Sequence, residues 1–342
     1  MARRALVTGA TGLVGSHIVE QLVRDGWSVR GLSRDDLSAA SLRAAGADPV
    51  MGDVLDETAM MRASDGVDVI FHTAAAITQS GGWEGYRRLN VDGTAIMIGA
   101  AAHSGARLLH LSSVAVYGPT FRYDHQGNKT SEDSPLGPLR SRSFYSRSKR
   151  ESEEMVMDAH RGGRIWATAV RPSVIYGPRD RQFVPRMATL LQARMMPAIG
   201  GGRTTLSVVH AANVASGAIL AATSDRAGGR AYNLANDLDV TVRDFFRLAG
   251  EGLGIHVRFV PVPRWIAKAG LRGFQLFDRV ALGGKFAVAA EGSLSFLSRD
   301  NPFTSERARS ELGWLPVVSP MEGVPAAFRW WATHRQQKRG RE

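Results

Sequence analysis

The sequence predicts an α/β fold built on a parallel sheet. Short apolar runs typical of buried strands alternate with helical segments through the first half of the chain, beginning with Arg4–Thr8, Ser16–Arg24 and Ser28–Leu32. The first of these strands leads into a glycine-rich turn, and a helix follows at once. Strands that alternate with helices in this way form a parallel, doubly wound sheet with helices on its faces.

The later elements continue this alternation. We expect a small-residue helix over Val91–His103 and further strands over residues 67–72, 106–112 and 165–171. Residues 120–143 are rich in Gly, Pro and Ser and predict a long loop, and long loops in compact domains are often functional. Beyond Gly177-Pro178 the pattern weakens, apart from a return to the sheet over residues 206–233.

This organisation predicts two domains and a short tail. The larger, sheet-containing domain is expected to comprise residues 1–178 and 205–235, and the smaller, substrate-binding one residues 179–204 and 236–335. Residues 336–342 form a basic tail.

Composition narrows the function classes. Of 342 residues, 44% are apolar and 22% charged, which is ordinary for a globular protein. The absence of cysteine excludes disulfides and thiolate chemistry, suits a cytoplasmic protein, and leaves no metal site to predict. A net charge of +11 favours anionic partners, but the arginines are scattered and no nucleic-acid motif accompanies them. No apolar run is long enough for a signal peptide or a transmembrane helix.

The first glycine turn predicts a dinucleotide site. Gly9, Gly12 and Gly15 are spaced by three between a strand and a helix. Such a turn lets the backbone approach a pyrophosphate, whose charge is stabilised by the free N–H groups at the helix start. We therefore expect Thr11, Leu13 and Val14 to join the glycines in binding the cofactor. The alternative is a tight strand-to-helix turn with no ligand.

The end of the second strand favours NADP(H) over NAD(H). An NAD-preferring site places a carboxylate there to hold the ribose hydroxyls, whereas this chain has Ser33 and then Arg34. Arg34 could donate to a 2′-phosphate, or it could pair with Asp35 and Asp36 as a surface ion cluster.

A third strand is followed by Asp53 and Val54, which we also expect at the cofactor. Asp53 could accept a hydrogen bond from the adenine amine, or it could cap a helix.

Three residues predict proton transfer at a carbonyl. Ser113 follows a central strand, and Tyr145 and Lys149 lie four residues apart on one face of a helix. A tyrosine pKa near 10 would have to fall by about three units, or about 4 kcal/mol, for a base at neutral pH. The Lys149 cation and an oxidised nicotinamide could supply this, while Ser113 binds the substrate oxygen. Alone, such a Tyr and Lys pair is more often helix surface.

Together these motifs resemble the extended short-chain dehydrogenase/reductases, also known as NAD-dependent epimerase/dehydratases. The resemblance covers nearly the whole chain and includes the segments 9–15, 72–76, 89–91, 112–118, 145–149, 171–178 and 311–314. It implies a Rossmann-type cofactor domain, a homodimer, and catalysis by Ser113, Tyr145 and Lys149. It further implies cofactor or site-ordering roles for a set of residues that comprises Ala74, Ala75, Ala76, Asn90, Pro172 and Val174.

Departures from the family pattern indicate which reaction to expect. The Asp-Glu pair of the dehydratases is replaced by Val114-Ala115, and the cysteine of some epimerases is missing. The arginine that meets a sugar-nucleotide diphosphate is also absent before Val209-His210, which leaves His210 as a structural residue. The chain is thus more similar to the dihydroflavonol reductase and 3β-hydroxysteroid dehydrogenase branch, whose members interconvert carbonyls and alcohols on apolar small molecules.

Two alternatives stay open. One is a sugar-nucleotide 4-epimerase with tightly held NAD, which needs only the Ser, Tyr and Lys. The other is a non-catalytic dinucleotide sensor, which needs only the glycine turn.

A last stretch, Val260–Leu297, interleaves apolar and basic residues. It predicts an amphipathic helix that covers the core, or an apolar lid over the substrate that rests on an anionic membrane surface.

Overall fold

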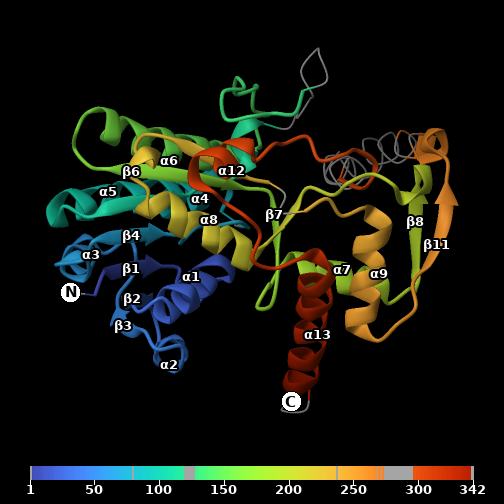
Figure 1. Cartoon of the computed structure of the whole chain (residues 1–342), viewed down its shortest axis with the longest axis horizontal. Coiled ribbons are helices and arrows are strands. Elements are labelled where there is room, and N and C mark those ends of the chain that lie inside the picture. The colour runs from blue at the N-terminus through green and yellow to red at the C-terminus, as the bar shows by residue number, and fades with distance from the viewer. Residues whose placement is uncertain are drawn as a thin grey trace. The chain divides into compact units, whose positions relative to one another are not determined.

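The computed structural model describes residues 2–78, 81–118, 128–235, 238–267, 269–270, 272 and 296–339. The chain divides into two compact units, each described here by itself (Figure 1). The first unit comprises Met1–Ile175, Ala211–Ala235 and Phe303–Val317. The second comprises Tyr176–His210, Asn236–Pro302 and Val318–Glu342.

A seven-stranded parallel sheet forms the centre of the first unit, in the order β10-β6-β5-β4-β1-β2-β3. Its strands are β1 (Arg4–Thr8), β2 (Ser28–Ser33), β3 (Asp48–Met51), β4 (Val69–His72), β5 (Arg107–Leu111), β6 (Ala167–Pro172) and β10 (Ala231–Leu234). Strands β1 and β4 are neighbours in the sheet, and Thr8 pairs with His72. The strand order reverses between these two strands, because β2 and β3 follow β1 on one side and β5 and β6 follow β4 on the other. The predicted α/β class and doubly wound parallel sheet are confirmed.

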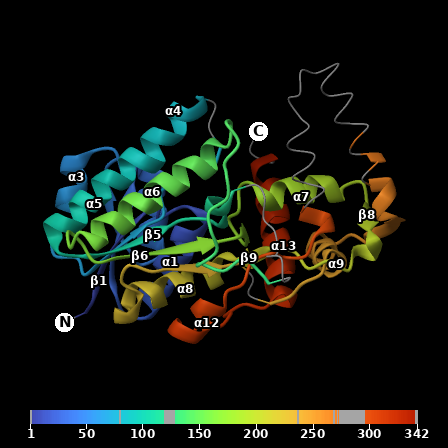
Figure 2. The same cartoon turned by 90° about the horizontal axis from the view of Figure 1, so that it is seen from above.

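Helices cover both faces of this sheet (Figures 1 and 2). Helices α3, α5 and α6 lie on one face, and α1 and α8 pack together on the other. The helical segments of the unit are α1 (Leu13–Arg24), α2 (Asp36–Ala44), α3 (Glu57–Ser64), α4 (Gly82–Tyr86), η1 (Arg87–Asp92), α5 (Gly93–Ser104), η2 (Val114–Tyr117), α6 (Phe144–Arg161), α8 (Ala211–Thr223), η4 (Asp225–Ala227) and α12 (Glu306–Leu312). The core beneath α3, α5 and α6 contains Leu6, Met60, Met97, Leu108 and Val156, all fully buried.

Two helices begin elsewhere than predicted. Helix α1 starts at Leu13 rather than Ser16, because Gly12 is the extended N-cap and Gly15 already lies inside the helix. The helix expected from Val91 is preceded by a π-helical turn, η1, that leads directly into α5.

The second unit carries small sheets and a helical core. Its elements are α7 (Phe183–Leu191), β8 (Met195–Ile199), η3 (Gly200–Gly202), β9 (Val208–His210), α9 (Val242–Leu253), β11 (Arg258–Val262) and α13 (Pro320–Arg339). Strand β7 (Val174–Tyr176) starts in the first unit, which includes Ile175, and ends in the second at Tyr176. Strands β11 and β8 pair in parallel, and β7 pairs with β9. Helices α9 and α13 pack against each other around Phe245, Phe246 and Phe328.

The unit boundaries differ from the predicted domain boundaries. Residues 205–210 belong to the second unit because β9 pairs with β7 rather than with the main sheet. Residues 303–317 belong to the first unit, where the buried Trp314 indole donates to the Asn213 carbonyl at 3.0 Å. The expected tail begins inside α13, which continues to Arg339.

Some predictions fall on residues outside the described ranges. Within the expected loop, residues 120–127 lie outside them, and residues 128–143 have no helix and only an isolated bridge from Thr130 to Phe303. Most of the Val260–Leu297 stretch also lies outside. None of the helices in the described part of the chain has the length and apolar character needed to cross a membrane.

Candidate active site

The glycine turn after β1 is packed so tightly that side chains are excluded. Gly9 has a φ of +65°, and a Cβ there would lie 2.8 Å from the Ala74 nitrogen. A Cβ on Gly15 would lie 2.2 Å from the Gly9 carbonyl oxygen. Gly12, in contrast, is exposed at the N-cap of α1, and no side chain caps that helix. This exposed start with its unfilled N–H groups fits the pyrophosphate of a dinucleotide.

The neighbouring cofactor candidates differ in exposure. Thr11 and Leu13 are half-buried in the turn, and the side chain of Val14 is buried. Ala74 and Ala75, just after β4, are half-buried, whereas Ala76 is buried. The Ala74 backbone N–H donates to the Thr8 hydroxyl at 3.3 Å, which ties this segment to β1.

At the end of β2, Ser33 and Arg34 take different positions. Ser33 is buried and its hydroxyl donates to the Asp35 carbonyl at 2.8 Å. Arg34 is exposed and has no ion-pair partner among the described residues. Asp35 instead caps α2 through the Ser38 N–H, and this bond, more than the Arg34 charge, lowers the Asp35 pKa. The predicted ion cluster is therefore wrong, and Arg34 is left available to an anion.

Asp53 is exposed after β3, and its carboxylate accepts from the Leu55 N–H at 2.9 Å. The alternative that Asp53 caps a helix is wrong, because Asp56 caps α3 by accepting from the Ala59 N–H. The Val54 side chain is buried in the core, which leaves its backbone for any cofactor contact.

The three predicted catalytic residues come together. Ser113 follows β5 and Tyr145 lies in the first turn of α6, and the Ser113 hydroxyl lies close enough to the Tyr145 phenol to influence its pKa. Burial raises the pKa of Tyr145, the neighbouring Ser113 hydroxyl lowers it, and the Tyr86 phenol raises it. The predicted depression of this pKa is thus not produced by the chain's own residues, and Lys149 does not contribute to the shift.

Lys149 lies one turn further along α6, with only 3% of its surface exposed. Its ammonium donates to the Leu111 carbonyl at 2.7 Å, at the end of β5. Burial lowers the Lys149 pKa to about 8, and the Glu153 charge partly offsets that shift.

Asn90 connects the cofactor segment to the catalytic helix. Its amide accepts from the Ala76 N–H at 2.7 Å and donates to the Ala76 carbonyl at 3.0 Å. The same amide donates to the Ser148 hydroxyl at 2.9 Å, and that hydroxyl donates to the Tyr145 carbonyl. Asn90 can reach both sides because it lies in the π-helical turn η1, a rare distortion often found at functional sites.

Two buried histidines, His72 and His110, lie beneath the site, and no sequence motif pointed to His110. His72 bonds Thr8 and Thr94, and its ring centroid lies 5.8 Å from that of His110. Burial lowers the His72 pKa to about 3 and holds that of His110 well below its usual value. Both imidazole rings are therefore neutral, so the Lys149 ammonium has no histidine cation beside it.

Other family-implied positions are also placed. Pro172 ends β6, and Val174, with 37% of its surface exposed, begins β7. His210 is buried in the second unit with its ring edge-on to Tyr176 at 5.2 Å, a position that agrees with a structural role.

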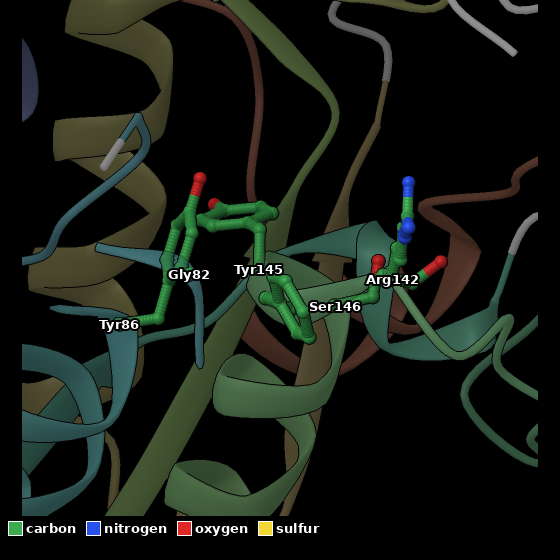
Figure 3. Close-up of a pocket in the computed structure, with 7 residues that line it drawn as sticks. Gly82, Tyr86, Arg142, Tyr145 and Ser146 are labelled. Carbon is green, nitrogen blue, oxygen red and sulfur yellow. The ribbon is translucent and has the colours of Figure 1, made fainter. Parts of the chain in front are cut away.

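A hollow of about 390 Å³ opens beside Tyr145 (Figure 3). Its lining residues are Gly82, Tyr86, Arg142, Ser143, Phe144, Tyr145 and Ser146. Sequence reasoning did not single out Tyr86 or Arg142, since neither lies in a motif and their only signal is proximity in sequence to motif residues.

A doubly wound sheet with this glycine turn, and with Ser, Tyr and Lys gathered at its strand ends, defines the class of NAD(P)-dependent short-chain oxidoreductases. The model of the NAD dependent epimerase/dehydratase family matches residues 5–235, and the chain belongs to that family. It is accordingly an enzyme, an NAD(P)-dependent oxidoreductase.

Named relatives match over nearly the full chain. A 4-hydroxy-2-methyl-3-oxo-4-farnesyl-3,4-dihydroquinoline-1-oxide ketoreductase from Stigmatella aurantiaca is 30% identical, covering 94% of this chain and 95% of its own. A decarboxylating sterol-4-alpha-carboxylate 3-dehydrogenase from Dictyostelium discoideum is 26% identical, with coverage of 94% and 99%. The crystal structure of gox2253 is 27% identical and superposes with a TM-score of 0.75, covering 96% of this chain and 98% of that one.

Proposed function

We propose that this enzyme is an NADP(H)-dependent reductase that interconverts a ketone or aldehyde and an alcohol on a mostly apolar small molecule. The observation that carries the proposal is that the Ser113 hydroxyl lies beside Tyr145, one helical turn from the buried Lys149. Two relatives support it, because their names describe a ketoreductase that acts on a farnesyl-bearing quinoline oxide and a decarboxylating 3-dehydrogenase that acts on a sterol carboxylate.

The chain's own residues suit carbonyl reduction. The raised pKa of Tyr145 keeps its phenol protonated at neutral pH, so that it can donate a proton to a carbonyl oxygen. Ser113 donates a second hydrogen bond to the same oxygen. Lys149 holds its cation at the end of β5, where it donates to the Leu111 carbonyl. When bound, the nicotinamide dinucleotide supplies the hydride. Arg34 would hold its 2′-phosphate, and the turn at Gly12 its pyrophosphate.

The runner-up function is sugar-nucleotide 4-epimerisation, which uses the same three residues. The position where such enzymes carry a diphosphate-binding arginine holds Leu206 here, buried in the apolar core of the second unit. A diphosphate bound without a fixed cation would lose its strongest contacts, which favours the reductase.

The assembly and location of the protein stay predictions. We propose a homodimer in which α5 and α6 of each copy pack together, as the family resemblance implies. Light scattering would test it, and a monomer at micromolar concentration would contradict it. The cytoplasmic location and the membrane-resting lid are likewise untested.

A substrate panel tests the reaction itself. NADPH consumption should be followed spectrophotometrically with aromatic aldehydes, cyclic ketones and 3-ketosteroids, beside epimerase assays with UDP- and GDP-sugars. We expect turnover of at least one carbonyl class and none of the sugars. If no carbonyl compound caused NADPH consumption while a sugar nucleotide was clearly epimerised, the proposal would be overturned.

A further inference from the structure

We propose that Arg142 binds a carboxylate on the substrate, a few bonds from the carbonyl that Tyr145 protonates. The hollow that Tyr86, Arg142 and Tyr145 line would then accept an oxo acid or its hydroxy acid more readily than a neutral carbonyl compound. This inference rests on the proposed carbonyl reduction and specifies its substrate class.

Arg142 is the arginine of this region that is left without a partner. Arg147 lies 3.8 Å over the Trp83 ring and pairs with Glu151 at 2.7 Å. Arg150 donates to the carbonyls of Val116 and Gly137. Arg142 is exposed and has no hydrogen-bond or ion-pair partner among the described residues, so its guanidinium is available for a ligand.

The opposite wall of the hollow is aromatic. Tyr86 packs edge-on to Tyr145, with ring centroids 6.4 Å apart, and its hydroxyl donates to the Ile77 carbonyl at 3.1 Å. Figure 3 shows the side chains of Tyr86, Tyr145 and Arg142 extending to the same side, with Tyr145 between the other two. A ligand whose carbonyl reaches Tyr145 therefore has an apolar surface on one side and a cation on the other.

Arg142 and Tyr145 are three residues apart and line one hollow, so a ligand in this hollow can contact both side chains. A planar guanidinium binds a carboxylate through two parallel hydrogen bonds. Among the described residues that line the hollow, none is acidic and competes for Arg142.

The test compares an acid with its own methyl ester. The wild-type enzyme and R142Q would oxidise a 3-hydroxy acid and its methyl ester, with cofactor reduction as the readout. The control is R226Q, another exposed arginine, which lies in η4 just before β10 and so at the opposite end of the sheet from the site. Calorimetry with the acid on cofactor-loaded Y145F and Y145F/R142Q adds a binding readout that needs no turnover.

We expect the wild type to prefer the acid, and R142Q to lower kcat/KM for the acid roughly tenfold to hundredfold more than for the ester. R142K should recover part of that loss, and R226Q should match the wild type. Equal activity on acid and ester, or an acid preference retained in R142Q, would overturn the inference while leaving carbonyl reduction intact. Arg142-dependent binding of the acid without turnover of any carbonyl or alcohol would support the subsite and contradict the proposed function.

Discussion

At the scale of single residues, Lys149 is a lysine whose charged form is disfavoured by burial. Lys149 is almost fully buried, and one carbonyl oxygen is its hydrogen-bond partner. Its lowered pKa means that the folded protein binds this proton less tightly than the unfolded chain does. The charged Lys149 therefore lowers the stability of the folded protein, as expected for a functional rather than a structural group.

Replacing Lys149 should therefore stabilise the protein while it removes activity. The destabilisation is fully present below pH 8, where lysine is charged in both states, and it fades as pH rises from about 8 towards 10.5. We expect Lys149→Met to raise the free energy of unfolding by about 1 to 2 kcal/mol at pH 7. This figure already subtracts the contribution of the lost hydrogen bond to the Leu111 carbonyl. Urea denaturation at pH 7 and pH 9.5 measures this. A variant less stable than wild type at pH 7 would contradict the account.

Tyr145 can be tested without disturbing the fold. Tyr145→Phe removes the proton donor beside Ser113, and it should cut turnover by about two to four orders of magnitude. Cofactor affinity should change little, since the ring remains. Steady-state kinetics and cofactor titration check both expectations, and retention of most activity would falsify the assignment of Tyr145.

Cofactor choice depends on Arg34 more than on its neighbour. A carboxylate at Ser33 would be buried against the Asp35 carbonyl, so Ser33→Asp risks the fold. Arg34→Gln leaves the strand intact and should weaken NADPH binding roughly tenfold to hundredfold while changing NADH binding much less. Fluorescence titration of both cofactors measures this. If wild type binds NADH more tightly than NADPH, the NADP(H) preference is wrong.

At the scale of elements, the regular parts of the site followed from sequence and the connections did not. Residues 4–8 were predicted as a strand with the bounds that β1 has, because an apolar run before a glycine turn is unambiguous. The π-helical turn at Asn90 was missed, since no local pattern distinguishes it from the start of α5. It forms because one amide must reach both Ala76 and Ser148.

Asn90→Ala tests this connection. It would leave the Ala76 N–H and carbonyl and the Ser148 hydroxyl without their buried partner. We expect a loss of about 2 to 4 kcal/mol in stability and weaker cofactor binding, with Asn90→Asp intermediate because it keeps an acceptor for Ala76. Chemical denaturation and cofactor titration measure the two effects. Wild-type values of both in Asn90→Ala would show that the contact has no such role.

At the scale of the whole molecule, the parallel sheet could be predicted from the sequence. The unit to which β9 and residues 303–317 belong could not. Periodicity identifies a strand but not its partner, so β9 was expected in the main sheet although it pairs with β7. Likewise, residues 303–317 belong to the first unit, where Trp314 donates a hydrogen bond to Asn213. These two residues are 101 positions apart in the sequence, so no local pattern predicts their contact. The proposed catalytic residues Ser113, Tyr145 and Lys149 could be selected from sequence because each belongs to a local motif, whereas Arg142 and Tyr86 are brought to the same hollow only by folding.

Net hydride transfer to a carbonyl is the central claim, and isotope transfer measures it most directly. The enzyme would be incubated with NADPH deuterated at the transferable position and with the active carbonyl from the panel, and the product analysed by mass spectrometry. We predict one deuterium on the carbinol carbon and one NADPH oxidised for each alcohol formed. A UDP- or GDP-sugar epimerised by enzyme-held cofactor, with no carbonyl reduced and no deuterium transferred, would contradict the account.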